Sequence, residues 1–181
     1  MSKILKYFLV IFFLIILCSC VGKKTQEILT INNIAMKLSS SAFLNNSKLP
    51  AKYSCDGQRI NPPLEIKDVP GNAQSLVLIV DDPDAPMGTF VHWLVWNIDP
   101  KTAEIPENSI PAGAKQGTNS GGRTGYFPPC PPSGTHRYIF KLFALDKVLN
   151  LTPNASKDNL EQSMQGHILD SVELIGLYSR K

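Results

Sequence analysis

Charged residues are sparse in this chain of 181 residues, at 18%, and neither sign dominates. The formal net charge is +3, but Lys3 and Lys6 lie in residues 1–19, a stretch that contains no acid. Without that stretch the chain has 16 basic residues (18 minus 2) and 15 acidic ones. A balance this close to zero gives no electrostatic reason to bind a polyanion, so we expect no nucleic acid partner.

Long apolar runs are also missing. The run Tyr7–Leu17 is shorter than the roughly 20 residues that a membrane-spanning helix needs. It follows Lys3 and Lys6 and leads into Cys18-Ser19-Cys20. A basic start, a short apolar run and an exit of small residues are typical of an export signal.

The exit Leu17-Cys18-Ser19-Cys20 resembles a bacterial lipobox, in which the cysteine after the cut is diacylated and becomes the new N-terminus. We therefore expect residues 1–19 to be a lipoprotein signal peptide and residues 20–27 to be a tether lipidated at Cys20. A buried acyl chain adds about 0.8 kcal/mol per methylene. The expected location is the exported side of the cell membrane or outer membrane, in the periplasm or at the cell surface. The alternative is a plain secretory signal.

Several common site motifs are absent. Gly121-Gly122-Arg123 lacks the strand-loop-helix context and the spacing of a phosphate loop, so we interpret it as solvated loop. No serine or threonine lies in a recognisable nucleophile elbow, and the His and Cys spacing matches no familiar zinc pattern. We therefore expect no cofactor and no metal, and we favour a protein that is not an enzyme.

Turn residues are plentiful, with 14 prolines and 12 glycines spread along the chain. Between them, apolar runs predict buried strands, and the spacing after Ser156 predicts a helix capped by that residue. The sum is a mainly β domain over residues 28–181, an antiparallel β-sandwich with a late C-terminal helix. The predicted elements are edge strands in Ile28–Leu38, central strands at Ser75–Asp81, Val91–Ile98 and His136–Leu145, a long loop over Asp99–Tyr126, a helix through Leu169 and a closing strand at Ser171–Tyr178.

Two turn-to-strand units carry the chemistry of the chain. The run Leu76–Val80 leads into Asp81-Asp82-Pro83-Asp84, and the next strand contains His92. Proline cannot donate to a sheet ladder, so the first strand must end at the acids. The alternation of a regular strand places His92 on one face with Leu94 and Trp96. The second unit, Cys130–Tyr138, starts a strand at His136.

The polar residues at these turns suit a small tetrahedral or carboxylate anion. Imidazole and phenol groups are short-range donors, and a carboxylate can orient an imidazole by accepting its other proton. Two alternatives stay open, since His92 alone would fit a core histidine and Asp84 could simply cap its turn. The candidate ligand-binding residues are Asp82, Asp84, His92, His136 and Tyr138.

Two cysteines, Cys55 and Cys130, remain after the leader. Outside the cytoplasm disulfides persist, so we expect the two to pair. The loop of 75 residues (130 minus 55) would then contribute roughly 4.5 kcal/mol in the chain-entropy model. The alternative is a free thiol beside the site.

Several separated blocks resemble the signatures of the phosphatidylethanolamine-binding protein family, in its bacterial and archaeal branch. The resemblance implies a sandwich of two antiparallel sheets, with a pocket for phosphate, acetate-like anions or phospholipid head groups, lined by the five candidate residues. Family members often have glycines where this chain has Pro128 and Pro129, which offer no N–H. The matching blocks are Tyr53-Ser-Cys-Asp-Gly57, Asn61-Pro-Pro63, Asp82-Pro-Asp-Ala-Pro86, His92-Trp-Leu-Val-Trp-Asn97, Pro131-Pro-Ser-Gly-Thr-His-Arg-Tyr138, Gly166-His-Ile-Leu169 and Tyr178-Ser-Arg180.

The resemblance favours a non-enzymatic binding module on an exported lipoprotein. Its expected partners are a small anion, the membrane through the N-terminal lipid, and a protein that it inhibits or regulates. Two other hypotheses stay open at this point. One is a hydrolase that uses His92 or His136 with Asp82, and the other is a metal site that adds a reduced Cys130.

Overall fold

A computed structural model describes residues 35–180. The predicted signal peptide (1–19), the lipidation site Cys20, the tether (20–27) and most of the predicted edge strands of Ile28–Leu38 lie outside these residues. The chain from Ile34 to Lys181 forms a compact unit with a core of its own, so this unit can be produced and studied alone. Within residues 35–180 no helix has the length and apolar character needed to cross a membrane.

The unit contains two sheets, as the sequence predicts. The larger has the strand order β2-β9-β8-β4-β5-β7, and the smaller has the order β1-β3-β6. All pairings are antiparallel except that of β2 with β9. The strands are β1 (Lys37–Ser39), β2 (Ser47–Lys48), β3 (Leu64–Lys67), β4 (Ser75–Asp82), β5 (Phe90–Ile98), β6 (Glu104–Ile105), β7 (Lys115–Gln116), β8 (His136–Leu145) and β9 (Ile168–Tyr178), and α2 (Lys157–Met164) is the late helix.

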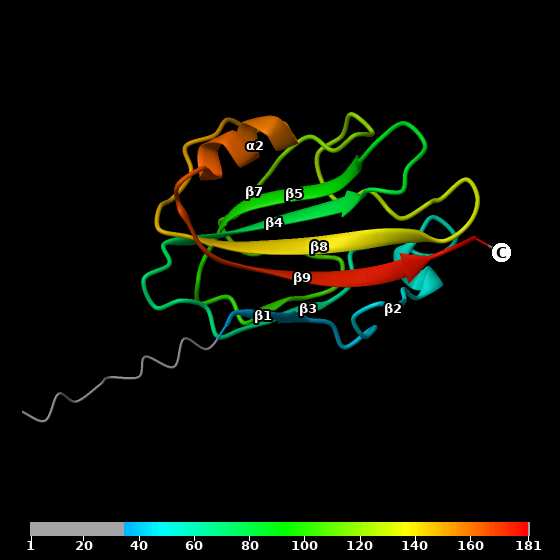
Figure 1. The fold of residues 1–181 in the computed structure, drawn as a ribbon, viewed down its shortest axis with the longest axis horizontal. Coiled ribbons are helices and arrows are strands. Elements are labelled where there is room, and N and C mark those ends of the chain that lie inside the picture. The colour runs from blue at the N-terminus through cyan, green and yellow to red at the C-terminus, as the bar shows by residue number, and fades with distance from the viewer. Residues whose placement is uncertain (1–34, 181) are drawn as a thin grey trace, which may run out of the picture. The chain divides into compact units, whose positions relative to one another are not determined.

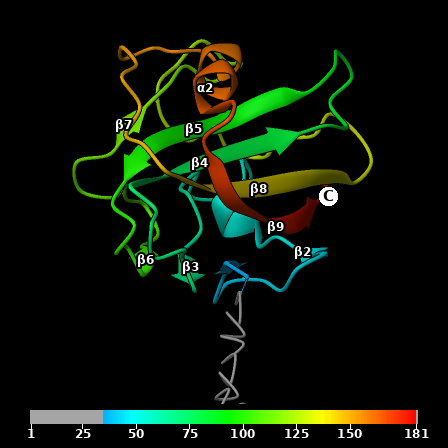
Figure 2. The ribbon, with the colours of Figure 1, turned by 60° about the vertical axis from the view of Figure 1, so that its left-hand side comes forward.

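The large sheet is covered on both faces (Figure 1, Figure 2). Toward the small sheet it contributes Leu78 of β4 and Phe140 of β8 to the main core. Its other face carries Ile79, which packs in a second cluster with Leu160 of α2. Burial on both faces explains the uninterrupted apolar run Leu76–Val80 within β4, a strand in which every residue is buried.

Strand β5 departs from the predicted alternation at His92. Val80 pairs with Trp93 and Asp81 pairs with Val91, so His92 is an extra residue on β5 and forms a β-bulge. Val91 therefore joins Leu94 and Trp96 in the cluster under α2, while Trp93 faces the main core. The predicted grouping of His92 with Leu94 and Trp96 is wrong, because the bulge turns His92 toward the side of Tyr138.

The late helix is shorter than predicted. Ser156 caps it as expected, accepting a hydrogen bond from the Asn159 backbone N–H, but the helix ends at Met164 rather than Leu169. Gly166 adopts a φ of +76°, which a helix cannot continue through, and β9 begins at Ile168. The predicted stripe of Leu160, Met164 and Ile168 fails at Ile168, which is 47% exposed.

Candidate functional site

The end of β4 places two adjacent acids on opposite faces of the large sheet. Asp82 lies on the same face of β4 as Leu78 and Val80, the face directed to the main core, and only 4% of its surface is exposed. Its Oδ1 accepts a hydrogen bond from the Asp84 backbone N–H at 2.9 Å, which closes the turn at Pro83. Its Oδ2 is left for a histidine.

His136, the first residue of β8, meets that oxygen. Its Nδ1 lies 2.7 Å from Asp82 Oδ2, with both side chains buried. A carboxylate oxygen only accepts, so Nδ1 carries the proton and the ring orientation is fixed. Nε2 of His136 has no hydrogen-bond partner among residues 35–180 and is free for a ligand.

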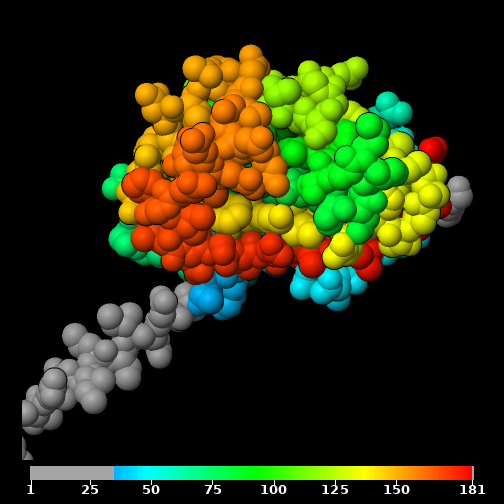
Figure 3. Space-filling model, turned by 45° about the horizontal axis from the view of Figure 1, so that its top comes forward, coloured from blue at the N-terminus to red at the C-terminus, as the bar shows by residue number. Residues whose placement is uncertain are grey.

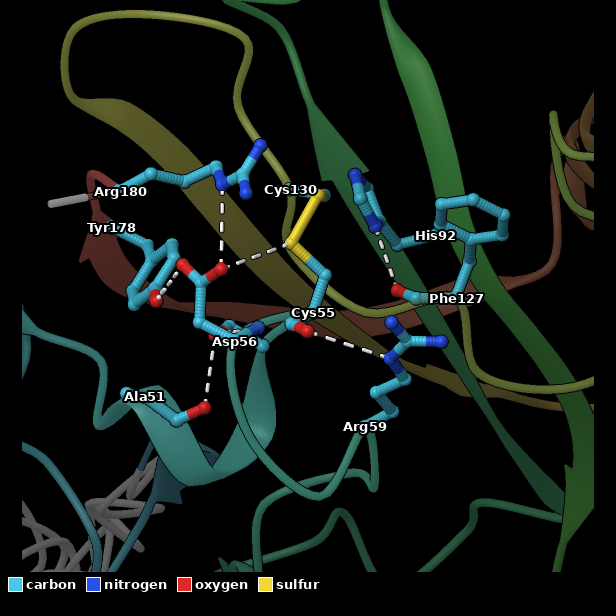
Figure 4. Close-up of a disulfide and its surroundings, with 10 residues drawn as sticks. Ala51, Cys55, Asp56, Arg59, His92, Phe127, Cys130, Tyr178 and Arg180 are labelled. Atoms are coloured by element: carbon cyan, nitrogen blue, oxygen red, sulfur yellow. Dashed lines mark hydrogen bonds and ion pairs between the residues drawn. A yellow bond between two sulfur atoms is a disulfide. The ribbon is translucent and has the colours of Figure 1, made fainter.

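His92 is fixed in the same way by a backbone carbonyl. Its Nδ1 donates to the Phe127 carbonyl oxygen at 2.7 Å, and the Phe127 N–H donates back to the His92 carbonyl at 2.8 Å. Figure 4 shows the other ring nitrogen directed away from Phe127. Burial lowers the pKa of His92, and the Phe127 carbonyl and the nearby Asp82 offset part of that shift. The free protein therefore holds His92 as a neutral imidazole at neutral pH.

Tyr138 completes the polar set. Its ring packs edge-on against His92, with centroids 5.1 Å apart. Its buried hydroxyl has no hydrogen-bond partner within the described part of the chain. Burial, followed by the negative charge of Asp82, raises the pKa of Tyr138, so the phenol stays protonated and can donate.

These four side chains line one cavity of about 130 Å³. It lies at the end of the sandwich where β4 and β9 finish and β8 begins (Figure 1). The space-filling view shows the two segments at its mouth, residues 83–90 in green and 130–136 in yellow, side by side (Figure 3). The remaining walls are largely apolar and come from Ala85, Pro86, Phe90, Phe127, Cys130, Pro131 and Pro132.

Asp84, the fifth predicted ligand residue, does not line the cavity. Its carboxylate binds the Arg137 guanidinium in a bidentate pair, at 2.7 Å to Nη2 and 2.9 Å to Nε, and also accepts the Arg137 backbone N–H. This pairing lowers the pKa of Asp84 to about 2. Asp84 thus joins the turn after β4 to the start of β8 through its ion pair with Arg137.

Asp81 belongs to the opposite face. Its buried carboxylate binds Lys141 at 3.1 Å and Lys157 at 3.2 Å. Lys157 opens α2, so this cluster fastens the helix to the end of β4 that presents Asp82. The sequence places both acids at a turn, but only the strand alternation separates the cavity residue from the structural one.

The predicted disulfide between Cys55 and Cys130 is present, with Cα atoms 5.4 Å apart (Figure 4). Next to it, the Cys55 N–H donates to the Pro129 carbonyl at 2.9 Å. Together these bonds hold the segment that carries Phe127 and Pro131 against the turn around Cys55. Phe90 and Phe127 were not identified from the sequence as residues of the cavity wall. The proline pair that follows Phe127 could have indicated that it lies in a stiff segment.

The geometry suits recognition of a small oxyanion better than metal binding. Within residues 35–180 no group of three or more His, Cys, Asp or Glu side chains is arranged to hold a metal ion. Cys130 is bonded to Cys55 and offers no thiolate. The cavity instead presents two imidazole edges and a phenol, beside a carboxylate already engaged by His136.

Comparison with known proteins agrees with the fold. Residues 39–179 match the family model described as Phosphatidylethanolamine-binding protein. A UPF0098 protein of Pyrococcus horikoshii is 54% identical over 151 residues, covering 78% of this chain and 76% of the relative. A UPF0098 protein of Pyrococcus abyssi is 46% identical over 178 residues, covering 93% of this chain and 95% of the relative.

Two solved structures are similar. The crystal structure of a putative phosphatidylethanolamine-binding protein homologue from Chlamydia trachomatis superposes with a TM-score of 0.79 at 45% identity, covering 81% of this chain and 99% of that one. The structure of E. coli YbcL, described as a new member of the mammalian PEBP family, gives a TM-score of 0.76 at 27% identity, again covering 81% of this chain and 99% of that one.

Proposed function

The chain belongs to the phosphatidylethanolamine-binding protein family, and from this premise we propose that it is a non-enzymatic module that binds small phosphoryl or carboxylate groups between His92 and His136. The observation that supports this function is that the two histidines are held in the same way beside the same cavity. Each has Nδ1 fixed by an acceptor, and both imidazole rings line one small cavity. At about 130 Å³ the cavity is far below the 300–1,000 Å³ of drug-sized pockets, so it suits a head group rather than a whole lipid.

Hydrolysis is the second candidate function, and the lining residues favour binding over it. None of the side chains that line the cavity is a serine or threonine, and Cys130 is held in the disulfide. A hydrolase would have to use water activated by an imidazole. Turnover of ester, peptide or phosphomonoester substrates that is lost in His92→Ala and His136→Ala would replace the binding function by this one.

Anion binding should depend on pH, because a neutral imidazole presents a lone pair at Nε2 and cannot donate. A bound anion favours the imidazolium form, so binding raises the pKa of His92 from its lowered value. Affinity therefore rises as pH falls, by at most about tenfold per pH unit for each proton taken up. Calorimetric titration of the unit from Ile34 to Lys181 with sulfate, which keeps its charge across the range, should give a tighter Kd at pH 5.5 than at pH 7.5.

Phosphate and phosphoethanolamine are the companion ligands at pH 6, and each should compete with sulfate for one site. Heat of binding that is absent for all three up to about millimolar concentration, or a sulfate affinity independent of pH, contradicts the proposed site. Competition by phosphoethanolamine alone would point to a ligand that needs its amine, near Asp82.

We further propose that the domain is displayed on the exported side of a bacterial membrane by a lipid on Cys20, where it regulates or inhibits a protein partner. The support is the lipobox-like Leu17-Cys18-Ser19-Cys20 and the disulfide, a bond typical of exported proteins. Expressed in a bacterium, the chain should fractionate with membranes, and Cys20→Ser should move it to the soluble or uncleaved pool. Mass spectrometry of an unmodified Cys20 in the parent chain would exclude the anchor.

A further inference from the structure

A second cavity lies on the other side of the Tyr126–Phe127 segment. Its volume is about 290 Å³, close to the lower limit of ligand pockets. Trp93 and Tyr126 line this cavity, and their chain neighbours His92 and Phe127 line the first, but no residue lines both. The complete lining is Arg59, Ile60, Asn61, Trp93, Asn108, Ser109, Ile110, Gln116 and Tyr126.

Arg59 is the charged residue of this cavity. It is exposed, and no carboxylate lies within ion-pair distance of it among residues 35–180. Its Nε donates to the Cys55 carbonyl at 3.4 Å, and Figure 4 shows the terminal nitrogens pointing away from Cys55. The parallel N–H groups that could grip an oxyanion are therefore open to a ligand.

The backbone of Arg59 is strained. Its φ is +62°, and the other non-glycine residues with positive φ in the described chain are all Asn or Asp. Asn and Asp tolerate this left-handed conformation because their short side chains bond locally, whereas a long side chain pays for it without such relief. Local strain kept at an exposed cation beside a cavity is the pattern expected when the side chain has a binding role.

The neutral polar groups of the cavity are also donors. Gln116 Oε1 accepts the indole N–H of Trp93 at 2.7 Å, and an indole can only donate, so the orientation of the Gln116 amide is fixed. Its NH₂ makes no hydrogen bond within residues 35–180. Asn108 adds a side-chain amide that makes no hydrogen bond within residues 35–180. The Asn61 side chain, by contrast, is fully engaged: its NH₂ donates to the Pro62 and Pro106 carbonyls, and its Oδ1 accepts the Ser109 N–H.

We propose that this second cavity binds the carboxylate of a small, partly apolar ligand, with Arg59 as the principal contact. One guanidinium supplies a single positive charge, which matches a carboxylate better than a doubly charged phosphate. Gln116 and Asn108 supply further N–H donors. Ile110, 48% exposed, and the aromatic pair of Trp93 and Tyr126 supply the apolar wall. This site is independent of the anion cavity between the histidines.

The probe is N-acetyl-leucine, with N-acetyl-leucinamide as its uncharged match, titrated into the unit from Ile34 to Lys181. The indole N–H signal of Trp93 in a two-dimensional NMR spectrum reports on the cavity. Trp96 is the internal control, because it lies in the separate cluster beneath α2. N-acetyl-leucine should shift the Trp93 signal saturably and leave Trp96 in place, and the amide should bind at least about tenfold more weakly.

Arg59→Asn removes the guanidinium and keeps a residue that accepts positive φ, so this variant should be at least as stable as the parent. It should lose N-acetyl-leucine affinity by about tenfold or more, while sulfate binding at the histidine cavity stays within about twofold. Arg123→Gln, at an exposed arginine of the glycine-rich loop, is the matched control and should change neither. Equal binding of acid and amide, no saturable Trp93 shift up to about 10 mM, or full affinity in Arg59→Asn would each overturn the carboxylate site.

Discussion

His136→Ala is expected to reduce sulfate or phosphate affinity by about 100-fold or more. Removing the imidazole deletes one charge-assisted donor, a contact of about 1.5–3 kcal/mol. It also leaves the Asp82 carboxylate, 2.7 Å from the lost ring and only 4% exposed, without its partner beside the incoming anion. The two effects act in the same direction. Calorimetry at pH 6 measures the change.

The chain contains a matched control. His167 also pairs with an acid through Nδ1, at 2.8 Å to Asp146, but it is 40% exposed and does not line the cavity. His167→Ala should leave the affinity within about twofold. An equal loss in both variants would mean that the effect of His136→Ala comes from general destabilisation, and the site would then lose its support.

A second variant separates the donor from the uncompensated charge. The double variant Asp82→Ala with His136→Ala removes both partners of the buried pair, which costs less than removing one. The single variant should lose about 3 kcal/mol of the free energy of unfolding. The double variant should recover part of that loss, and part of the anion affinity lost in the single variant. A double variant that binds anions no better than His136→Ala would show that Asp82 contributes more than orientation of the ring.

Breaking the Cys55–Cys130 disulfide has the other large expected effect. The bond closes a loop across 75 residues, and the chain-entropy model assigns such a loop roughly 4.5 kcal/mol of stabilisation. For a unit of this size, about 4 kcal/mol corresponds to a decrease in Tm of about 10 °C or more. The double substitution Cys55→Ser with Cys130→Ser should show this decrease in calorimetric or fluorescence-detected unfolding.

The disulfide also bears on the cavity. The segment that it holds carries Phe127, whose carbonyl fixes His92, and Pro131 of the cavity wall. Sulfate affinity should therefore fall several-fold together with Tm. A dithiol reductant provides the control, because it should reproduce both changes in the parent chain and alter neither in the Ser variant. An unchanged affinity in the Ser variant would show that the hydrogen bonds between His92 and Phe127 hold the segment without the covalent bond.

Much of the architecture could be predicted because local signals agree with it. β8 has the predicted bounds, since its apolar residues alternate between two buried faces and a proline-rich turn precedes it. Pro83 likewise marks the end of β4 and places Asp82 as the last residue of that central strand. The two histidines were assigned to the ends of separate strands, and the structure brings both to the same cavity.

The errors arise where tertiary contacts decide between locally similar outcomes. The predicted role of Asp84 competed with a turn-capping role, and only the position of Arg137 on β8 shows where that carboxylate goes. The acceptor for His92 Nδ1 is the backbone carbonyl of Phe127, and because every residue has a carbonyl, no residue type in the sequence could identify it. The helix after Ser156 has a continuing apolar pattern, but Gly166 and the pairing of β9 with β8 end it.

The extra residue in β5 has a consequence for anyone who would move this receptor to another protein. Grafting the four polar side chains of the cavity onto regular strands of a different scaffold would present Val91 or Trp93 where His92 should stand. The insertion at position 92 has to be copied with the side chains, since the irregularity in the backbone aims the imidazole. Deleting residue 92 from a transplanted strand would remove both the bulge and the imidazole, and anion binding should be lost although the other groups remain.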